Sequence, residues 1–183
     1  DKVANTASVY GAFLKHIKKS ASQKLILQSA DFIENDNSHK VYKEDSNELI
    51  KKIEGDILYL DPPYNQRQYS ANYHLLNTIA LYDNFEPKGK TGLREYNRSK
   101  YSQKNEVSKS FEELIKNANF KYIFLSYNNE GLMSEDEVKN IMKKYGIYDL
   151  QKKEYSRFKA DKTENRNHKA NSTFEYLYIL EKK

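Results

Sequence analysis

Residues 57–64, Ile57-Leu58-Tyr59-Leu60-Asp61-Pro62-Pro63-Tyr64, decide the fold that we expect for this chain. The apolar run 57–60 predicts a buried strand, and the two prolines end it in a rigid loop because proline fixes φ and has no N–H. Asp61 and the proline carbonyls are hydrogen-bond acceptors, and Tyr64 adds an aromatic face. The loop therefore suits a planar ligand that carries an amino group, such as adenine or cytosine. The alternative is a plain strand end at which Asp61 caps a turn.

Composition limits the classes of protein to which the chain can belong. Its 183 residues suffice for one domain with a core, and we expect residues 1–183 to form a single domain. The net charge of +5 favours a polyanionic partner, with an acidic protein as the alternative. The absence of Cys excludes thiolate metal sites, and the four His show no metal-ligand spacing. No apolar stretch approaches the roughly 20 residues of a membrane span, so we expect a cytoplasmic protein without a metal or a membrane partner.

The segment before the loop predicts several short elements. Apolar residues at helical spacing, Val9, Phe13 and Ile17, indicate an amphipathic helix. The remaining elements expected here are strands at 25–27 and 41–42, a helix that starts at Glu44-Asp45-Ser46 and is stopped by Gly55, and a strand at 56–60.

After the loop, helices and strands alternate. We expect a helix at 71–82, a helix opened by a capping box of Ser110 and Glu113, a central strand at 122–125, a polar loop at 126–131, a helix opened by Ser134 and Glu137 and stopped by Gly146, and closing strands at 148–155 and 173–180. Two basic stretches, 86–109 and 152–169, each hold seven Lys or Arg against three acidic residues, a balance of +4. They are interpreted either as solvated loops or as phosphate contacts.

This order of elements predicts an α/β fold with a mostly parallel sheet that ends in an antiparallel hairpin. In such sheets, ligands bind beyond the carboxyl ends of the strands. Asp45, Asp61–Tyr64 and Ser126–Asn129 each follow a predicted strand. We therefore expect the three segments to share one edge of the sheet.

Asp61–Tyr64 matches the Asp-Pro-Pro-Tyr motif of DNA adenine-N6 methyltransferases. The longer string Tyr59–Tyr69, followed by Asn72-Tyr73-His74, resembles the modification enzymes of type II restriction-modification systems, as do residues 5–14, 125–131 and 155–158. The resemblance implies a Rossmann-like fold that uses S-adenosylmethionine, a bacterial origin, and double-stranded DNA as the partner.

The resemblance also implies roles for individual residues. Asp61 and the Pro62 carbonyl would accept the two N–H hydrogens of the target amine, in a loop completed by Pro63 and Tyr64. The target base must be flipped out of the duplex, and Tyr64 would stack on it. Tyr64 as a core aromatic is the alternative.

Other residues receive cofactor and DNA roles. Asp45 and Ser46, with Asp61, would hold S-adenosylmethionine, whereas a plain helix cap would need no ligand. The residues expected to border the flipped base or to contact DNA are Arg67, Tyr127, Asn128, Tyr155, Arg157 and Phe158, for which surface or packing roles are the alternatives.

The glycines depart from the family's pattern. Such enzymes carry a Phe-x-Gly-x-Gly-like loop beside the first strand, and none of the six glycines of this chain stands in that pattern. We therefore expect a C-terminal catalytic portion that lacks the N-terminal strand and the glycine loop, with a target-recognition region upstream or on a separate chain. Two alternatives remain: an RNA base-amine methyltransferase, and a non-catalytic DNA-binding remnant or subunit.

Overall fold

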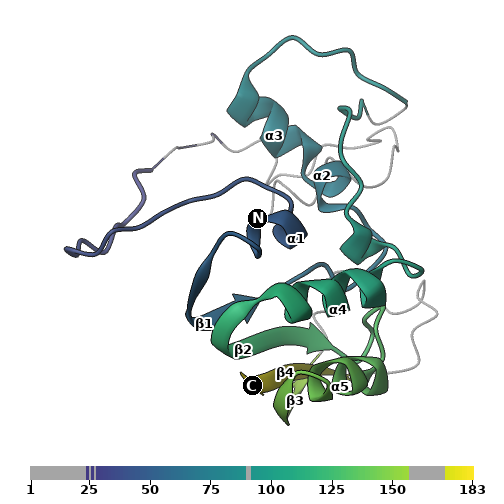
Figure 1. The fold of residues 1–183 in the computed structure, drawn as a ribbon. Helices are drawn as coiled ribbons and strands as arrows, with labels where there is room; N and C mark the ends of the chain where they lie inside the picture. The colour runs from purple at the N-terminus through teal and green to yellow at the C-terminus, as the bar shows by residue number, and fades with distance from the viewer. Residues whose placement is uncertain (1–23, 25, 27, 90–91, 157–171) are drawn as a thin grey trace. The chain divides into compact units, whose positions relative to one another are not determined.

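The computed structural model of the chain describes residues 24, 26, 28–89, 92–156 and 172–183, which form two compact units (Figure 1). The larger unit contains residues 44–68 and 98–183, and the smaller contains 1–43 and 69–97. The predicted helix around Val9–Ile17 and residues 25 and 27 of a predicted strand lie outside the described residues. The strand expected at Val41 and Tyr42 is not formed. Both side chains are exposed, so a strand there would bury neither of them.

The larger unit is built on a four-stranded sheet in the order β1-β2-β4-β3 (Figure 1). Its strands are β1 (Glu54–Leu60), β2 (Asn119–Asn128), β3 (Gly146–Ser156) and β4 (Ser172–Lys182). β1 pairs with β2 in parallel, whereas the β2–β4 and β3–β4 pairs are antiparallel. The predicted antiparallel closing pair is confirmed. A mostly parallel sheet is wrong for the described strands, because the early strands expected to extend the parallel part are not among them.

The helix before β1 is shorter than predicted. α1 covers Ser46–Leu49, and Asp45 is its N-cap residue. Gly55, expected to stop this helix, lies inside β1 beside Phe120 of β2. A Cβ atom at Gly55 would stand 3.0 Å from Cε1 of Phe120, so the glycine accommodates a close cross-strand contact rather than a helix end.

Two amphipathic helices cover one face of the sheet. α4 covers Val107–Asn117 and α5 covers Glu135–Lys143. The capping box of α5 is confirmed, with Ser134 Oγ accepting from Glu137 N at 3.2 Å and Glu137 Oε2 accepting from Ser134 N at 2.7 Å. The Ser110 capping box is wrong, because the buried apolar face of α4 begins one turn earlier at Val107 and leaves Ser110 inside the helix. Gly146 opens β3 instead of ending α5.

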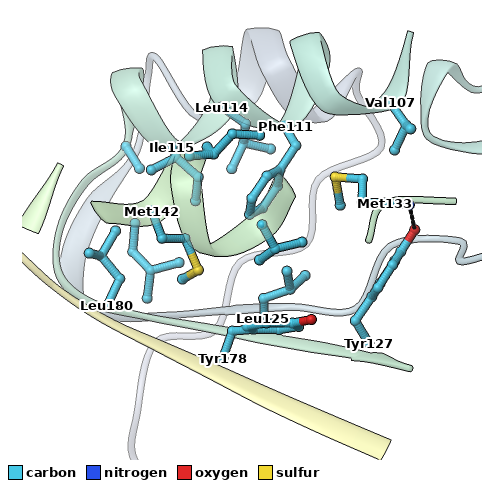
Figure 2. Packing of buried hydrophobic residues seen from close by; sticks show 14 of the residues in the cluster. Val107, Phe111, Leu114, Ile115, Leu125, Tyr127, Met133, Met142, Tyr178 and Leu180 are labelled. Carbon is cyan, nitrogen blue, oxygen red and sulfur yellow. Dashed lines mark hydrogen bonds between the residues drawn. The ribbon is translucent and has the colours of Figure 1, made fainter. Parts of the chain in front are cut away.

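The core lies between these helices and the sheet (Figure 2). Its fully buried members include Phe111 and Ile115 of α4, Met142 of α5, Leu125 of β2 and Leu180 of β4. Burying each side chain of this size contributes roughly 1.5–3 kcal/mol. The apolar run 122–125, predicted as a central strand, supplies Ile123 and Leu125 to this core.

The smaller unit contains two short helices where one was predicted at 71–82. They are α2 (Tyr69–Asn72) and α3 (His74–Leu81), separated by Tyr73. In the basic stretch that follows, Arg94 donates to both carboxylate oxygens of Asp83 at 2.8 and 2.7 Å and stacks over the Phe85 ring. The guanidinium of Arg94 is thus engaged within this unit. No helix in the described part of the chain is both long and apolar enough to cross a bilayer.

Candidate active site

The loop after β1 opens onto a pocket in the larger unit. The pocket has a volume of about 290 Å³. Its walls come from four places: Tyr59–Pro63, Ser46 of α1, Ser99 with Tyr101, and Phe111 with Leu114 of α4. Ser99 caps η3, a 3-10 helix at Lys100–Ser102, by accepting from Tyr101 N at 3.2 Å. Segments 53 residues apart in the sequence, from Ser46 to Ser99, therefore meet around the Asp-Pro-Pro loop.

The pocket combines apolar walls with a few acceptors at its rim. The side chain of Asp61 is exposed, and Pro62 and Pro63 are half-buried. Proline has no N–H, so this stretch of backbone offers carbonyl oxygens and no donor from residues 62 and 63. Such a site can accept two N–H hydrogens from an amine whose ring lies against apolar and aromatic surfaces.

Of the three residues predicted to hold the methyl donor, two line the pocket and one does not. Ser46 lines the pocket together with Asp61. Asp45 does not line it; its Oδ1 accepts from Asn47 N at 2.9 Å and caps α1. The structure therefore brings Ser46 and Asp61 together and shows Asp45 as a helix cap outside the pocket, so its contact with the donor stays a prediction.

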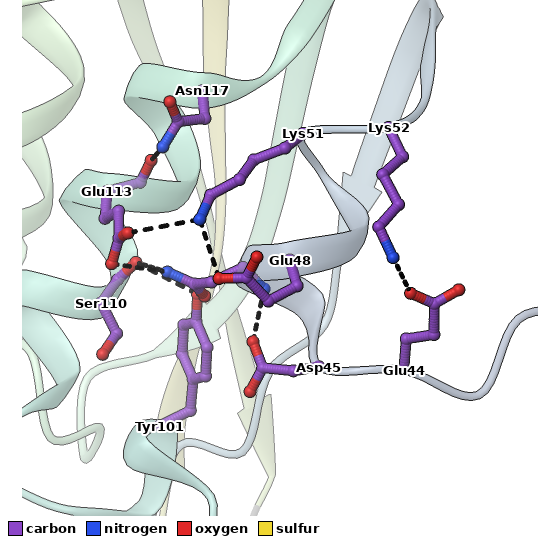
Figure 3. Close-up of polar contacts among 10 residues, drawn as sticks. Glu44, Asp45, Glu48, Lys51, Lys52, Tyr101, Ser110, Glu113 and Asn117 are labelled. Carbon is purple, nitrogen blue, oxygen red and sulfur yellow. Dashed lines mark hydrogen bonds and ion pairs between the residues drawn. The ribbon is translucent and has the colours of Figure 1, made fainter.

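A buried tyrosine that sequence reasoning missed joins the pocket walls. Tyr101 Oη donates to Asn47 Oδ1 at 2.8 Å and lies 3.3 Å from the carbonyl oxygen of Ser110 (Figure 3). Asn47 Nδ2 in turn donates to the same carbonyl at 2.9 Å. Burial raises the pKa of Tyr101, so its hydroxyl stays a donor at neutral pH. These contacts tie α1 and α4 to η3.

Tyr101→Phe is expected to lower the free energy of unfolding by about 1–2 kcal/mol, because Asn47 Oδ1 loses its donor in a half-buried place. Urea denaturation measures this change. Tyr82→Phe is the matched control, since Tyr82 is 95% exposed, and it should change stability by less than about 0.5 kcal/mol. Equal effects of the two substitutions would contradict a structural role for the Tyr101 hydroxyl.

Tyr64 does not belong to the hydrophobic core and is 39% exposed. Its carbonyl oxygen accepts from Leu132 N at 2.9 Å, which connects the Asp61–Tyr64 loop to the segment between β2 and α5. Tyr64 is accordingly partly accessible to solvent at the end of the loop, rather than used for core packing.

Tyr127 and Asn128 were predicted in a polar loop, but both are the buried last residues of β2. The strand runs on because Tyr127 is a core residue whose Oη accepts from Met133 N at 3.3 Å. Asn128 Oδ1 accepts from Glu130 N at 3.0 Å and organises the turn that follows. Neither residue lines the pocket.

Two of the remaining predicted DNA contacts, Arg67 and Tyr155, do not line the pocket. Arg67 is exposed, and its backbone N donates to Asn65 Oδ1 at 2.9 Å. Tyr155 is 59% exposed near the end of β3. Arg157 and Phe158 lie outside the described residues.

Comparison with known proteins identifies relatives over the whole chain. The chain is 70% identical over 182 residues to the Type II methyltransferase M.NlaIII of Neisseria lactamica, covering 100% of this chain and 54% of that protein. It is 46% identical over 185 residues to the Type II methyltransferase M.FokI of Planomicrobium okeanokoites, covering 98% of this chain and 28% of that protein. Identity to the Type II methyltransferase M.CviAII of Paramecium bursaria Chlorella virus 1 is 36%, covering 98% of this chain and 53% of that protein.

The chain thus spans about half or less of the length of these relatives. No solved structure matches it. Residues 1–141 match the family model for D12 class N6 adenine-specific DNA methyltransferases. On this match, together with the relatives, the chain belongs to the D12 class of N6 adenine-specific DNA methyltransferases.

Proposed function

We propose that the protein carrying this chain transfers a methyl group from S-adenosylmethionine to the N6 amino group of adenine in double-stranded DNA, as the modification enzyme of a restriction-modification system. Membership of the D12 class and the similarity to type II methyltransferases support this activity. A Rossmann-like fold, of which the parallel β1–β2 pair is a part, is proposed on the same grounds.

One observation carries the proposal: Asp61, Pro62 and Pro63 line the same pocket as Ser46, Tyr101 and Phe111. The acceptors of the motif thus stand at the rim of a mainly apolar and aromatic hollow at the carboxyl end of β1. Ligand pockets commonly have volumes of ~300–1,000 Å³. At about 290 Å³, this pocket is close to the lower end of that range and has room for a nucleoside-sized group.

The motif would act by binding both hydrogens of the amine. The lone pair of the adenine amino group is delocalised into the ring, so the amine is a poor nucleophile. Acceptance of its two N–H hydrogens by the Asp61 carboxylate and the Pro62 carbonyl favours the geometry in which the lone pair is localised on nitrogen. The residues therefore contribute positioning and electrostatic stabilisation, without a covalent intermediate on the protein.

S-adenosylmethionine, when bound, supplies the electrophilic methyl group. Ser46 and Asp61 are the pocket residues proposed to contact it, and the exposed carboxylate of Asp45 directly precedes Ser46 in the sequence. The apolar and aromatic walls with hydroxyls at Ser46 and Ser99 fit an adenosine group. Because the six glycines lack the pattern that approaches the methionine part of the donor, we propose that residues 1–183 supply mainly the amine-holding part of the site.

Contact with DNA is proposed for the exposed residues beside the motif. Tyr64 would stack on the flipped adenine, and Arg67 would bind a phosphate. Tyr127 and Asn128 would support the residues that contact DNA indirectly, through the turn after β2 that they organise. A role for Tyr155, Arg157 and Phe158 in DNA contact remains part of the proposal.

Transfer of labelled methyl groups tests this function directly. The natural protein that carries this sequence is incubated with labelled S-adenosylmethionine and either duplex DNA or ribosomal RNA. We expect label in duplex DNA as N6-methyladenine, with at least about tenfold less label in RNA. Preferential labelling of RNA would support the RNA base-amine alternative, and label in cytosine would contradict the proposed target.

A further inference from the structure

The side chain of Gln68 connects the end of the Asp61–Gln68 loop to the segment that forms another wall of the pocket. Gln68 Oε1 accepts from the backbone N of Ser99 at 2.8 Å, and Gln68 Nε2 donates to the carbonyl oxygen of Ser99 at 3.3 Å. One side-chain amide thus binds both backbone groups of a single residue, as a neighbouring strand would.

The two halves of this contact differ in importance. The Ser99 carbonyl also accepts from Gln103 Nε2 and from Ser102 N, both at 3.2 Å. The Ser99 N–H, by contrast, donates to Gln68 Oε1 at 2.8 Å, which is shorter than any of the contacts to the carbonyl. A half-buried N–H without an acceptor is costly, so the acceptor half of the Gln68 amide is the one that holds the segment.

Two further contacts join segment 99–102 to other parts of the larger unit. Ser102 Oγ donates to the carbonyl oxygen of Arg67 at 3.4 Å, next to the Gln68 contact. On its other side, Tyr101 Oη donates to Asn47 of α1. Segment 99–102 is therefore joined both to the end of the motif loop and to the helix that carries Ser46.

The two segments that this contact joins, the Asp61–Gln68 loop and segment 99–102, both contribute to the pocket walls. Asp61–Pro63 begin the loop and line the pocket, while Gln68 ends the loop and does not line it. Ser99 and Tyr101, which Gln68 and Asn47 hold, line the pocket at another wall. The contact of Gln68 with Ser99 thus joins two pocket walls through a residue that does not itself line the pocket.

We infer that Gln68 is a positioning residue of the proposed methyltransferase site, because it fixes segment 99–102 relative to the Asp61–Gln68 loop. This inference rests on the proposed function for its effect on catalysis. A displacement of about 1 Å in a substrate-positioning wall can cost on the order of 100-fold in rate. Loss of the two hydrogen bonds of one side chain in an otherwise intact wall is expected to cost less, about tenfold.

Two substitutions separate the hydrogen bond from packing. Gln68→Met keeps the length of the side chain and removes both hydrogen bonds. Gln68→Glu keeps the acceptor for the Ser99 N–H. Gln66, which is exposed and two residues earlier in the loop, offers Gln66→Met and Gln66→Glu as controls for the same changes in size and charge.

Amide hydrogen exchange in the natural protein reports on the segment without any need for activity. In Gln68→Met, the amide of Ser99 should exchange about tenfold faster than in the wild-type protein. In Gln68→Glu and in both Gln66 variants, the exchange rate should stay within about threefold of wild type. Unchanged exchange in Gln68→Met would overturn the structural part of the inference, whether or not the protein methylates DNA.

The rate of methyl transfer tests the catalytic part. In Gln68→Met, kcat should fall about tenfold while KM for DNA changes less than about threefold, because Gln68 is argued to align the walls rather than to bind DNA. Gln68→Glu should retain more than about a third of kcat relative to Gln66→Glu. A kcat in Gln68→Met equal to that of Gln66→Met would overturn this part. Absence of methylation by the wild-type protein would instead refute the proposed function and leave the exchange result to decide on Gln68.

Discussion

Asp61→Asn is expected to lower kcat for adenine methylation by at least about 100-fold. The substitution keeps the shape of the side chain but removes its charge and turns one acceptor oxygen into an NH₂ donor, which cannot bind an N–H of the target amine. Removing a single preorganised group that stabilises charge in a transition state typically costs about 10²–10³ in kcat. Single-turnover transfer of labelled methyl groups to duplex DNA measures the effect.

Asp56→Asn is the matched control for this result. Asp56 is an exposed carboxylate on β1, five residues before Asp61, and it does not line the pocket. Its substitution should change kcat less than about twofold. If Asp61→Asn methylated DNA as fast as Asp56→Asn, the motif would not hold the amine. Another group of the protein would then have to bind the amine.

Gly131→Ala is expected to lower the free energy of unfolding by about 2 kcal/mol. A Cβ atom at this position would stand 2.0 Å from Cε1 and 2.7 Å from Cζ of Tyr127. The Tyr127 ring cannot easily give way, since it is buried in the core and its hydroxyl accepts from Met133 N. Urea denaturation of the wild-type protein and the variant measures the change.

The same substitution should also reduce methylation, because Leu132, the next residue, donates to the Tyr64 carbonyl of the motif loop. A double-mutant cycle identifies the ring as the cause. In a Tyr127→Leu background, Gly131→Ala should cost less than about 1 kcal/mol, since the colliding ring is gone. The same cost in both backgrounds would show that Gly131 is needed for another reason.

Elements with strong local signals were predictable from the sequence. The α5 capping box formed as expected because Ser134 and Glu137 are three residues apart and interact within one turn. The β2 core strand formed because its apolar run suits a buried strand. The same Ser-x-x-Glu pattern failed at Ser110, where the apolar spacing from Val107 and Phe111 extends the helix past the expected cap.

Features that depend on distant pairing were not predictable. β4 lies between β2 and β3, and no local pattern encodes that order. The contacts of Tyr101 with Asn47 and of Gln68 with Ser99 join residues 54 and 31 positions apart. The stretch that contains Ser99 and Tyr101 has no helical or strand periodicity, so it was expected to be either a solvated loop or a phosphate contact.

The candidate site was predicted in part. Placing polar residues at the carboxyl end of a strand led to Asp61–Pro63, which do line a pocket with Ser46. The same argument placed Ser126–Asn129 beside them, but β2 continues through Asn128, and Tyr127 is part of the core. The strand expected before Asp45 is absent, and Asp45 caps α1 instead.

A thermodynamic cycle between Asp61 and the target base tests most directly whether this loop holds the amine. After the methylated adenine has been mapped, binding of the natural protein and of Asp61→Ala is measured on duplexes that carry adenine or purine, which lacks the 6-amino group, at that position. We predict a coupling free energy of about 1.5–3 kcal/mol between the side chain and the amino group, as for a hydrogen bond to a charged acceptor. Loss of the same binding energy on both duplexes, with no coupling, would contradict the assignment of Asp61 to the target amine.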